Sequence, residues 1–259
     1  MIVVTVMNYP DRFNENVMCI AWINQVRKHF GEKIDICILT ENNLPKPVKN
    51  EADKNNVNVL IKGRTNYVDF SGHPDAKKAG HNVSFKLYNL CQIDSPFIFI
   101  DADAFILRDA ERLFSASKDQ GFIAVNHQVI PGQTDHLVEP VLNSGVMVVS
   151  DPGLFVWEDF MKILLRDRRF VHPGTDQSLI NSRFKESDYD YTHPDVGYEW
   201  NSWARYTVWD SENGPTCKGL PVEHAVSINH YWNDAKPWNI DCPIFKNYVD
   251  MSIDLGKQR

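Results

Sequence analysis

The sequence contains no long hydrophobic run and no excess of basic residues. No apolar segment approaches the ~18 residues that a membrane-spanning helix needs, so we expect no membrane span. The 34 acidic and 27 basic residues give a net charge of −7, which disfavours non-specific binding to nucleic acid or to a membrane surface. Residues 1–7 lack the basic start of a signal peptide and have the pattern of a strand. We therefore expect a cytoplasmic protein without a nucleic-acid partner.

Paired-cysteine motifs are absent as well. The five cysteines are scattered and form no Cys-x-x-Cys pair, at Cys19, Cys37, Cys91, Cys217 and Cys242. This pattern indicates neither a zinc site nor a disulfide framework, and reduced, mostly buried thiols are the better interpretation. A chain of 259 residues with 43% hydrophobic and 24% charged residues is long enough to bury a sizeable core.

Short apolar segments alternate with helical patterns in the first half of the chain. The strands that they predict cover residues 2–6, 34–39, 57–61, 97–100 and 121–125. The predicted helices cover residues 11–30, 84–92 and 109–116, with Ser84 as the N-cap of the second. This alternation is typical of an α/β fold with a mostly parallel central sheet flanked by helices. Ligands of such sheets bind at the carboxyl ends of the strands.

The second half of the chain is less regular. A strand is predicted at residues 146–149, and helices at residues 154–165 and 175–181. Residues 189–209 then hold several aromatic residues without a clear period, namely Tyr189, Tyr191, Tyr198, Trp200, Trp203, Tyr206 and Trp209. Two interpretations are equally supported: an irregular segment held by its own aromatic rings, or a surface on which sugar rings stack.

The strand predicted at residues 97–100 is followed by two carboxylates, Asp101 and Asp103. In extended backbone, residues i and i+2 point to the same side, so both carboxylates can converge on one hard divalent cation. The alternative is a pair of solvated turn residues, because Asp-x-Asp alone is a weak motif. With four apolar residues before the pair, the two interpretations are about equally supported.

His230 follows the apolar, strand-like residues 225–228 and precedes Lys236, which is followed by Pro237. A lone histidine is usually structural. Added to two carboxylates, however, one imidazole gives a mixed oxygen and nitrogen site that suits Mn²⁺ or, less well, Mg²⁺. Lys236 would then face the phosphates of the same ligand.

Two further polar segments flank predicted elements. Asn143 and Ser144 come before the strand predicted at residues 146–149, and Gly145 permits close approach of the backbone. Asp176 and Gln177 lie at the start of the helix predicted at residues 175–181. Taken alone, Asp176 is better interpreted as a first-turn charge that complements the helix dipole.

These segments and their order along the chain resemble the motifs of the GT-A glycosyltransferases. The resemblance is to family 8 in particular, the family of glycogenin and the lipopolysaccharide galactosyltransferases. Residues 2–9 resemble its opening nucleotide-binding strand, and Phe85-Lys86-Leu87 resembles its Thr-Lys-Leu pattern. Asp101-Ala102-Asp103 matches its metal-binding Asp-x-Asp.

The other motifs of the family follow in sequence. Leu142-Asn143-Ser144-Gly145-Val146-Met147 is similar to its Phe-Asn-Ser-Gly-Val-Met segment, and Asp176-Gln177 with Asn181 is similar to its Asp-Gln-x-x-Leu-Asn. Residues 230–238 keep the spacing of its His-x-x-Gly-x-x-Lys-Pro-Trp. Each motif is modest alone, but five in the right order are strong.

The resemblance implies a single Rossmann-like GT-A domain over residues 1–259, with a nucleotide-binding half at about residues 1–125 and a donor-sugar and acceptor half at about residues 126–259. It implies transfer of a sugar from a nucleotide-sugar, a UDP-sugar, to the hydroxyl of a saccharide or glycan, with retention at the anomeric carbon. It assigns Mn²⁺, or Mg²⁺, to Asp101, Asp103 and His230. It assigns catalysis to Lys86, Asn143, Asp176 and Gln177. It assigns donor binding to Asn8, Tyr9, Lys86, Ala102, Ser144 and Lys236.

The sequence departs from the family pattern at three places. Asn233 stands where the family has a glycine near the diphosphate, so the phosphate pocket is expected to have a different shape. Residues 126–135 do not match the family's sugar-contacting segment, and residues 189–209 have no counterpart. The identity of the donor sugar and the acceptor specificity are therefore expected to be particular to this chain.

Two other functions use similar residues. A nucleotidyltransferase also pairs aspartates with a metal, but it usually has a glycine-rich loop with Arg or Lys after the first strand, which residues 7–11 lack. The other alternative is an inactive sugar-binding module of the same fold. The presence of Asp101, Asp103, His230 and Lys236 weighs against it.

Overall fold

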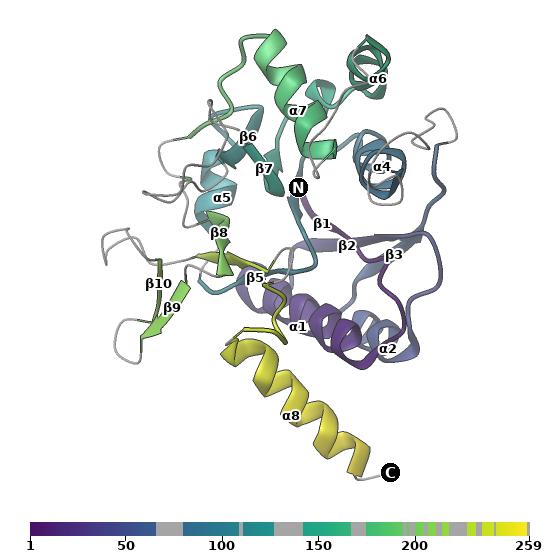
Figure 1. The fold of residues 1–259 in the computed structure, drawn as a ribbon, viewed down its shortest axis with the longest axis vertical. Helices are drawn as coiled ribbons and strands as arrows, with labels where there is room; N and C mark the ends of the chain where they lie inside the picture. Colours follow the sequence, from purple (N-terminus) through teal and green to yellow (C-terminus); the bar gives the residue numbers. More distant parts are fainter. Residues whose placement is uncertain are drawn as a thin grey trace.

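A six-stranded sheet forms the centre of the protein (Figure 1). The computed structural model describes residues 1–65, 80–108, 111–126, 142–166, 175–193, 196, 200–204, 207–210, 214–217, 227–231, 235–240 and 242–257. The strands of the central sheet are β1 (Ile2–Val6), β2 (Asp35–Thr40), β3 (Asn58–Ile61), β4 (Phe97–Ile100), β6 (Phe122–Asn126) and β7 (Leu142–Val149). Their order is β3-β2-β1-β4-β7-β6, and β7 runs antiparallel to both of its neighbours while β1 to β4 run parallel. The predicted α/β fold with a mostly parallel sheet is confirmed.

Each of the inner strands buries both of its faces. In β1, Val3 belongs to the hydrophobic cluster on one face of the sheet, whereas Val4 belongs to the cluster on the other face. In β4, Ile98 and Phe99 are divided in the same way. Successive side chains of a strand point to opposite faces, so uninterrupted apolar strands create two hydrophobic faces that helices have to cover.

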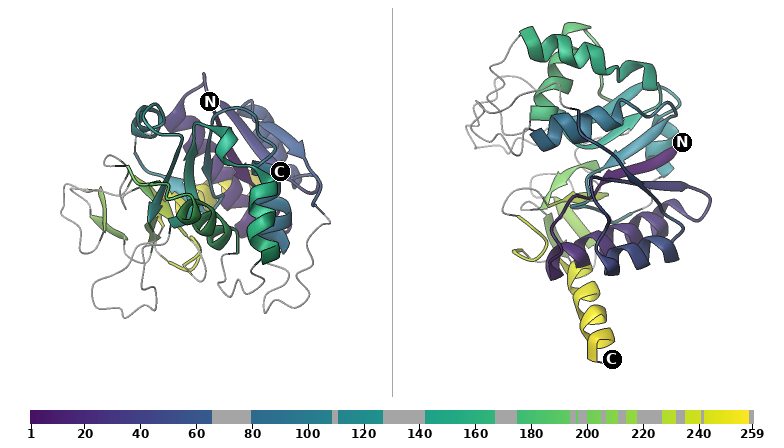
Figure 2. Two further views of the ribbon diagram at one scale, coloured as in Figure 1. Left: turned by 90° about the horizontal axis from the view of Figure 1, so that it is seen from above. Right: turned by 90° about the vertical axis from the view of Figure 1, so that its right-hand side faces the viewer.

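Two helical layers cover these faces, as Figures 1 and 2 show. The first layer consists of α1 (Phe13–Phe30) and α2 (Lys46–Lys54), which bury Trp22 and Val48. The second consists of α6 (Trp157–Arg166) and α7 (Thr175–Glu186), which bury Phe160 and Leu179. The last helix, α8 (Pro243–Lys257), projects from the body of the protein. No helix within the described residues is long and apolar enough to cross a membrane.

A smaller sheet joins the central sheet at the end of β4. It contains β5 (Ala104–Ile106), β11 (Ile228–His230) and β8 (Ser202–Trp203). The middle strand, β11, pairs antiparallel with β5 and parallel with β8. Because only residues 101–103 separate β4 from β5, this pairing holds the end of β11 next to the carboxyl end of β4. A separate pair, β9 (Thr207–Asp210) and β10 (Gly214–Cys217), is antiparallel.

Several predicted elements have different boundaries; the helix predicted at residues 175–181, for example, extends to Glu186. Two of these elements carry residues of the predicted site. Ser84 is not an N-cap, because it lies inside a π-helix, Gly80–Leu87, that continues into α4 (Tyr88–Leu90). Five consecutive buried residues, 83–87, do not follow the 3.6-residue period on which the prediction depended. The strand predicted at residues 146–149 begins at Leu142, so Asn143 and Ser144 lie within it. These polar residues can continue a buried strand because their side chains have hydrogen-bond partners in the protein.

The buried Arg27 holds the end of α1 in place. Its Nη1 donates to the carbonyl oxygens of Gly31 at 2.8 Å and Ile34 at 2.9 Å, and its Nη2 donates to that of Asn55 at 2.7 Å. Gly31 ends the helix with a φ of 75°, a conformation that favours glycine. The guanidinium thereby connects α1 to the chain just before β2 and just before β3.

We expect Arg27→Met to lower the free energy of unfolding by about 2–4 kcal/mol, because three carbonyl groups lose the charged donor of a buried guanidinium. Urea denaturation measures this difference. The matched control is Arg12→Met, since the Arg12 side chain is 73% exposed and makes only a peripheral ion pair. A loss that is equally small in both variants would contradict the role assigned to Arg27.

Candidate active site

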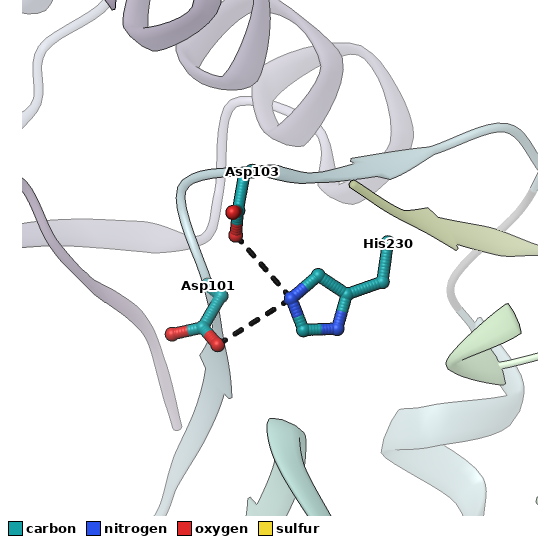
Figure 3. Close-up of side chains that lie close together, drawn as sticks. All are labelled: Asp101, Asp103 and His230. Atoms are coloured by element: carbon teal, nitrogen blue, oxygen red, sulfur yellow. Dashed lines mark ion pairs between the residues drawn. The ribbon is translucent and has the colours of Figure 1, made fainter. Parts of the chain in front are cut away.

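Strand pairing brings a histidine to the two carboxylates that follow β4. Asp101 and Asp103 lie in the turn between β4 and β5, where the Ala104 amide donates to the Asp101 carbonyl at 2.9 Å. His230, the last residue of β11, pairs with Ala104, and the next amide, that of Tyr231, donates to the Asp103 carbonyl at 2.8 Å. Figure 3 shows the side chains of Asp101, Asp103 and His230 pointing toward one another.

The geometry of this cluster fits a divalent cation. His230 Nε2 lies 3.3 Å from Asp103 Oδ1 and 3.6 Å from Asp101 Oδ2. Each residue offers one ligand atom, a carboxylate oxygen or a ring nitrogen, and these three atoms lie within 4.8 Å of one another. Two carboxylate oxygens and an imidazole nitrogen suit Mn²⁺, and the carboxylates also suit Mg²⁺. The three residues predicted as metal ligands are therefore brought together, with a donor set that can hold the predicted ion.

The two carboxylates differ in their electrostatic surroundings. Burial alone would raise the pKa of Asp103, but the ammonium of Lys236, which contacts Asp103 Oδ2, and the nearby His230 outweigh burial and hold the pKa well below its ordinary value. Burial raises the pKa of Asp101 above its ordinary value, because the charges of Lys86 and His230 offset it only in part. Asp101 is thus the carboxylate whose ionisation gains more from a bound cation.

Lys86 links this cluster to a third carboxylate. Its Nζ lies 3.1 Å from Asp101 Oδ1, 3.1 Å from Asp176 Oδ2 and 3.3 Å from the carbonyl oxygen of Ser144. These contacts use the three N–H donors of an ammonium group. Burial would lower the pKa of Lys86, but Asp101 and Asp176 outweigh it and raise the pKa, so the group is charged. This arrangement favours a positioning role for Lys86 beside the catalytic and donor-binding roles predicted for it.

The residues predicted to face a donor sugar form a second cluster beside the first. Ser144 Oγ donates to Asp176 Oδ2 at 3.0 Å, and the Ser144 amide donates to Gln177 Oε1 at 3.4 Å. On the other side, the Asp101 amide donates to the Gly145 carbonyl at 2.8 Å, because β4 and β7 are paired. The start of α7, the middle of β7 and the end of β4 therefore meet at one place.

Gly145 and Asn201 enclose the imidazole of His230. A Cβ atom at Gly145 would overlap the imidazole ring and lie 3.0 Å from Asn143 Oδ1, so glycine alone fits here. Asn201 Oδ1 lies 2.9 Å from His230 Nδ1, and Asn201 Nδ2 donates to Asn143 Oδ1 at 2.9 Å. Asn201 was not predicted as a site residue. It lies within the aperiodic segment 189–209, where no local pattern marks it, and only the folded chain brings it to His230.

The donor-binding residues predicted near the amino-terminus lie at or near the same edge of the sheet. Asn8 follows β1, and its Oδ1 accepts from the Glu41 amide, next to the end of β2, at 2.7 Å. Tyr9 follows Asn8 and is half-buried, and burial and, second, the charge of Asp103 raise the pKa of its hydroxyl. Ala102 is 1% exposed, and its methyl group packs in the hydrophobic cluster beneath α1.

The described aromatic side chains of residues 189–209 belong to the core. Trp200 is 1% exposed and packs in the cluster beneath α1, so a sugar-stacking role is wrong for this residue. The hydroxyl of Tyr189 accepts from the Phe122 amide at 3.0 Å, and Tyr191 packs in the opposite cluster. The other aromatic residues of this segment lie outside the described residues or are described by their backbone alone, namely Tyr198, Trp203, Tyr206 and Trp209. The same holds for two departures from the family pattern, Asn233 and residues 127–135.

The fold is that of the GT-A glycosyltransferases. No family model and no curated protein matches the sequence. The likeness comes from comparison with solved structures.

The galactosyltransferase LgtC, solved with analogues of its donor and acceptor sugars, matches with a TM-score of 0.63 and 16% identity, over 98% of this chain and 96% of LgtC. The ligand-free glycosyltransferase GlyE of Streptococcus pneumoniae TIGR4 matches with a TM-score of 0.62 and 14% identity, over 96% of this chain and 59% of GlyE. The bifunctional glycosyltransferase WbbM matches with a TM-score of 0.58 and 16% identity, over 96% of this chain and 49% of WbbM.

We expect Gly145→Ala to weaken Mn²⁺ binding by roughly 10–100-fold, because the imidazole of His230 has to move to admit the methyl group. Electron paramagnetic resonance of unbound Mn²⁺ measures the affinity, and circular dichroism checks the fold. Gly63→Ala is the control, since a Cβ there has no atom within 4 Å. Mn²⁺ affinity equal to that of the unmodified protein would remove His230 from the ligand set.

Proposed function

We propose that this protein is a metal-dependent glycosyltransferase, a single domain over residues 1–259, that moves a sugar from a UDP-sugar to the hydroxyl of a saccharide or glycan, with retention at the anomeric carbon. The observation that carries the proposal is the junction of two polar clusters at the carboxyl end of β4. One cluster has the composition of a metal site, and the other consists of hydrogen-bonding groups suited to a sugar. Ligands of open α/β sheets bind at this edge, and the likeness to glycosyltransferase structures supports the assignment.

Asp101, Asp103 and His230 would hold Mn²⁺, with Mg²⁺ as a weaker substitute. When bound, the ion supplies Lewis-acid stabilisation of the charge that grows on the departing nucleoside diphosphate. Lys236 would act on the same diphosphate, and the contact of its ammonium with Asp103 supports this role. Such a charged contact in a closed site contributes roughly 2–4 kcal/mol in the transition state.

Asn143, Ser144, Asp176 and Gln177 would orient the donor sugar and the acceptor hydroxyl. Asp176 Oδ2 is held by Lys86 and by the Ser144 hydroxyl, and no hydrogen bond joins its Oδ1 to another residue of the described part of the chain. This second oxygen can therefore accept from a sugar hydroxyl. A carboxylate that is paired with an ammonium is a weak nucleophile, so the proposal includes no covalent intermediate on Asp176.

The first test is the dependence of nucleotide binding on the metal. We expect UDP with Mn²⁺ to raise the melting temperature more than GDP or ADP with Mn²⁺, and we expect EDTA to remove the effect. The reason is that a ligand that binds only the native state stabilises it in proportion to its occupancy. UDP-sugars are then screened in the same way, and release of UDP from the best of them is measured with water and with saccharide acceptors.

The other results of this screen each reject a defined part of the proposal. A clear preference for GDP would reject the UDP-sugar donor. Undiminished transfer in EDTA, with no metal left in the protein, would reject metal dependence. Binding of a UDP-sugar without turnover on any acceptor would indicate a sugar-binding module. Release of pyrophosphate from UTP and a sugar phosphate would indicate a nucleotidyltransferase.

A second test separates the metal site from the lysine beside it. We expect Asp103→Asn to lower turnover by roughly 10²–10⁴-fold and to weaken Mn²⁺ binding, since the amide keeps the shape but not the charge. We expect Lys236→Ala to lower turnover by about 10²-fold while Mn²⁺ still binds. The double variant should be little worse than Asp103→Asn, because both groups stabilise the same leaving group.

The control for the lysine is Lys162→Ala, since the Lys162 side chain is 75% exposed and pairs with Asp159 on the surface of α6. Its turnover is expected to match that of the unmodified protein. Fully additive losses in the double variant would mean that Lys236 acts away from the metal, and the proposed site would then be wrong.

A further inference from the structure

A continuous line of hydrogen bonds runs from β7 to the imidazole of His230. The Gly145 amide donates to Asn143 Oδ1 at 2.8 Å, and a backbone amide can only donate. The Asn143 atom in this contact is therefore oxygen, so the Asn201 atom that lies 2.9 Å from it has to be the nitrogen, Nδ2. This leaves Asn201 Oδ1 facing His230 Nδ1 at 2.9 Å. An amide oxygen can only accept, so Nδ1 carries the hydrogen.

In the neutral imidazole, this tautomer leaves the lone pair on Nε2. Nε2 is the atom that faces Asp103 at 3.3 Å and Asp101 at 3.6 Å. An imidazole binds a metal through such a lone pair, and the partner of its other nitrogen sets which atom carries it. We infer that Asn201 is a positioning residue, which fixes the Nδ1–H tautomer and the ring orientation of His230 and thereby prepares Nε2 to bind a divalent cation. The link of this role to sugar transfer rests on the proposed function.

The backbone around Asn201 supports this role. Asn201 directly precedes β8, and in that strand Trp203 pairs with His230 of β11. The pairing sets the distance between the Asn201 side chain and the ring. Asn201 and His230 are 2% and 3% exposed, so solvent has little access to compete for Nδ1. Gly145 also lies against the ring, next to Cε1 and Nδ1.

Asn201 has two functions that substitution can separate. Its oxygen serves His230, and its nitrogen serves Asn143. Asn201→Asp keeps an acceptor for Nδ1–H but loses the donor to Asn143, whereas Asn201→Leu loses both. Asn24→Leu is the matched control, because the half-buried Asn24 donates to the Ile20 carbonyl and to Glu51, between α1 and α2.

The first measurement is long-range ¹H–¹⁵N nuclear magnetic resonance of the histidine rings in metal-free protein, at a pH high enough for the imidazole of His230 to be neutral, with His230 assigned by comparison with His230→Gln. We expect the Nδ1–H tautomer in the unmodified protein and in Asn201→Asp. In Asn201→Leu we expect a mixture with the Nε2–H form. An Nε2–H tautomer in the unmodified protein would overturn the inference without reference to any variant.

The second measurement is Mn²⁺ affinity by electron paramagnetic resonance. We expect Asn201→Leu to bind Mn²⁺ roughly 10–100-fold more weakly, as is typical when the partner of a metal-binding histidine is lost. Asn201→Asp should bind Mn²⁺ at least as tightly as the unmodified protein but should release UDP more slowly, because Asn143 Oδ1 keeps the Gly145 amide as a donor but loses the Asn201 side chain. Asn24→Leu should be unchanged in both respects.

The outcomes distinguish this inference from the proposed function. Unchanged Mn²⁺ affinity and an unchanged tautomer in Asn201→Leu would overturn the role of Asn201 and leave the proposed function intact. An absence of Mn²⁺ binding in the unmodified protein would refute the proposed metal site, while the tautomer spectrum would still decide the hydrogen-bond assignment. If Asn201→Leu does not fold, the spectra of the unmodified protein and of Asn201→Asp decide, and a mixed tautomer in Asn201→Asp would count against the inference.

Discussion

The buried ammonium of Lys86 is the interaction on which the arrangement of the site depends. It lies between Asp101, which belongs to the metal-type cluster, and Asp176, which belongs to the cluster proposed to orient the sugar. Without a cation between them, the two carboxylates would repel each other, and the buried Asp176 would also lack the solvation that water provides. Removing one partner of a buried ion pair costs about 3–5 kcal/mol, because the remaining charge is uncompensated. The same ammonium lies over the Phe99 ring, 4.4 Å from its centre, which connects this charge network to the hydrophobic core.

Two strand pairings place the other residues around this ammonium. The antiparallel register of β4 with β7 sets Ile100 opposite Val146, so the chain that leaves β4 at Asp101 passes the backbone of Gly145. The register of β11 with β5 sets His230 opposite Ala104. Because the side-chain period of a strand is two residues, a slip of one residue in either pairing would turn these side chains to the opposite face.

The sequence predicted the parts of this site that have a local pattern. Apolar runs predicted β1 and β4, and the carboxylates that follow β4 lie where an α/β sheet binds its ligands. Asn201 could not be predicted, because its importance arises from contacts with Asn143 and His230 that are distant in sequence. Trp200 has the composition of a sugar-stacking residue but packs in the core, since an aromatic ring serves either role and only burial distinguishes them. Asn143 and Ser144 were placed outside β7 because buried polar residues interrupt the apolar pattern on which strand prediction relies.

The middle residue of the Asp-x-Asp turn gives the site a particular thermodynamic character. The methyl group of Ala102 packs in the hydrophobic cluster beneath α1, while the residues on either side of it carry the carboxylates. The turn is thus attached to the core and is not free to sample other conformations. Ordering a flexible residue costs about 1–2 kcal/mol in backbone entropy, and a turn that is already ordered avoids most of this cost when a cation binds. The backbone here is therefore pre-organised, so the selectivity of the proposed metal site among cations would be set by the spacing of ligands that cannot readily adjust to an ion of another size.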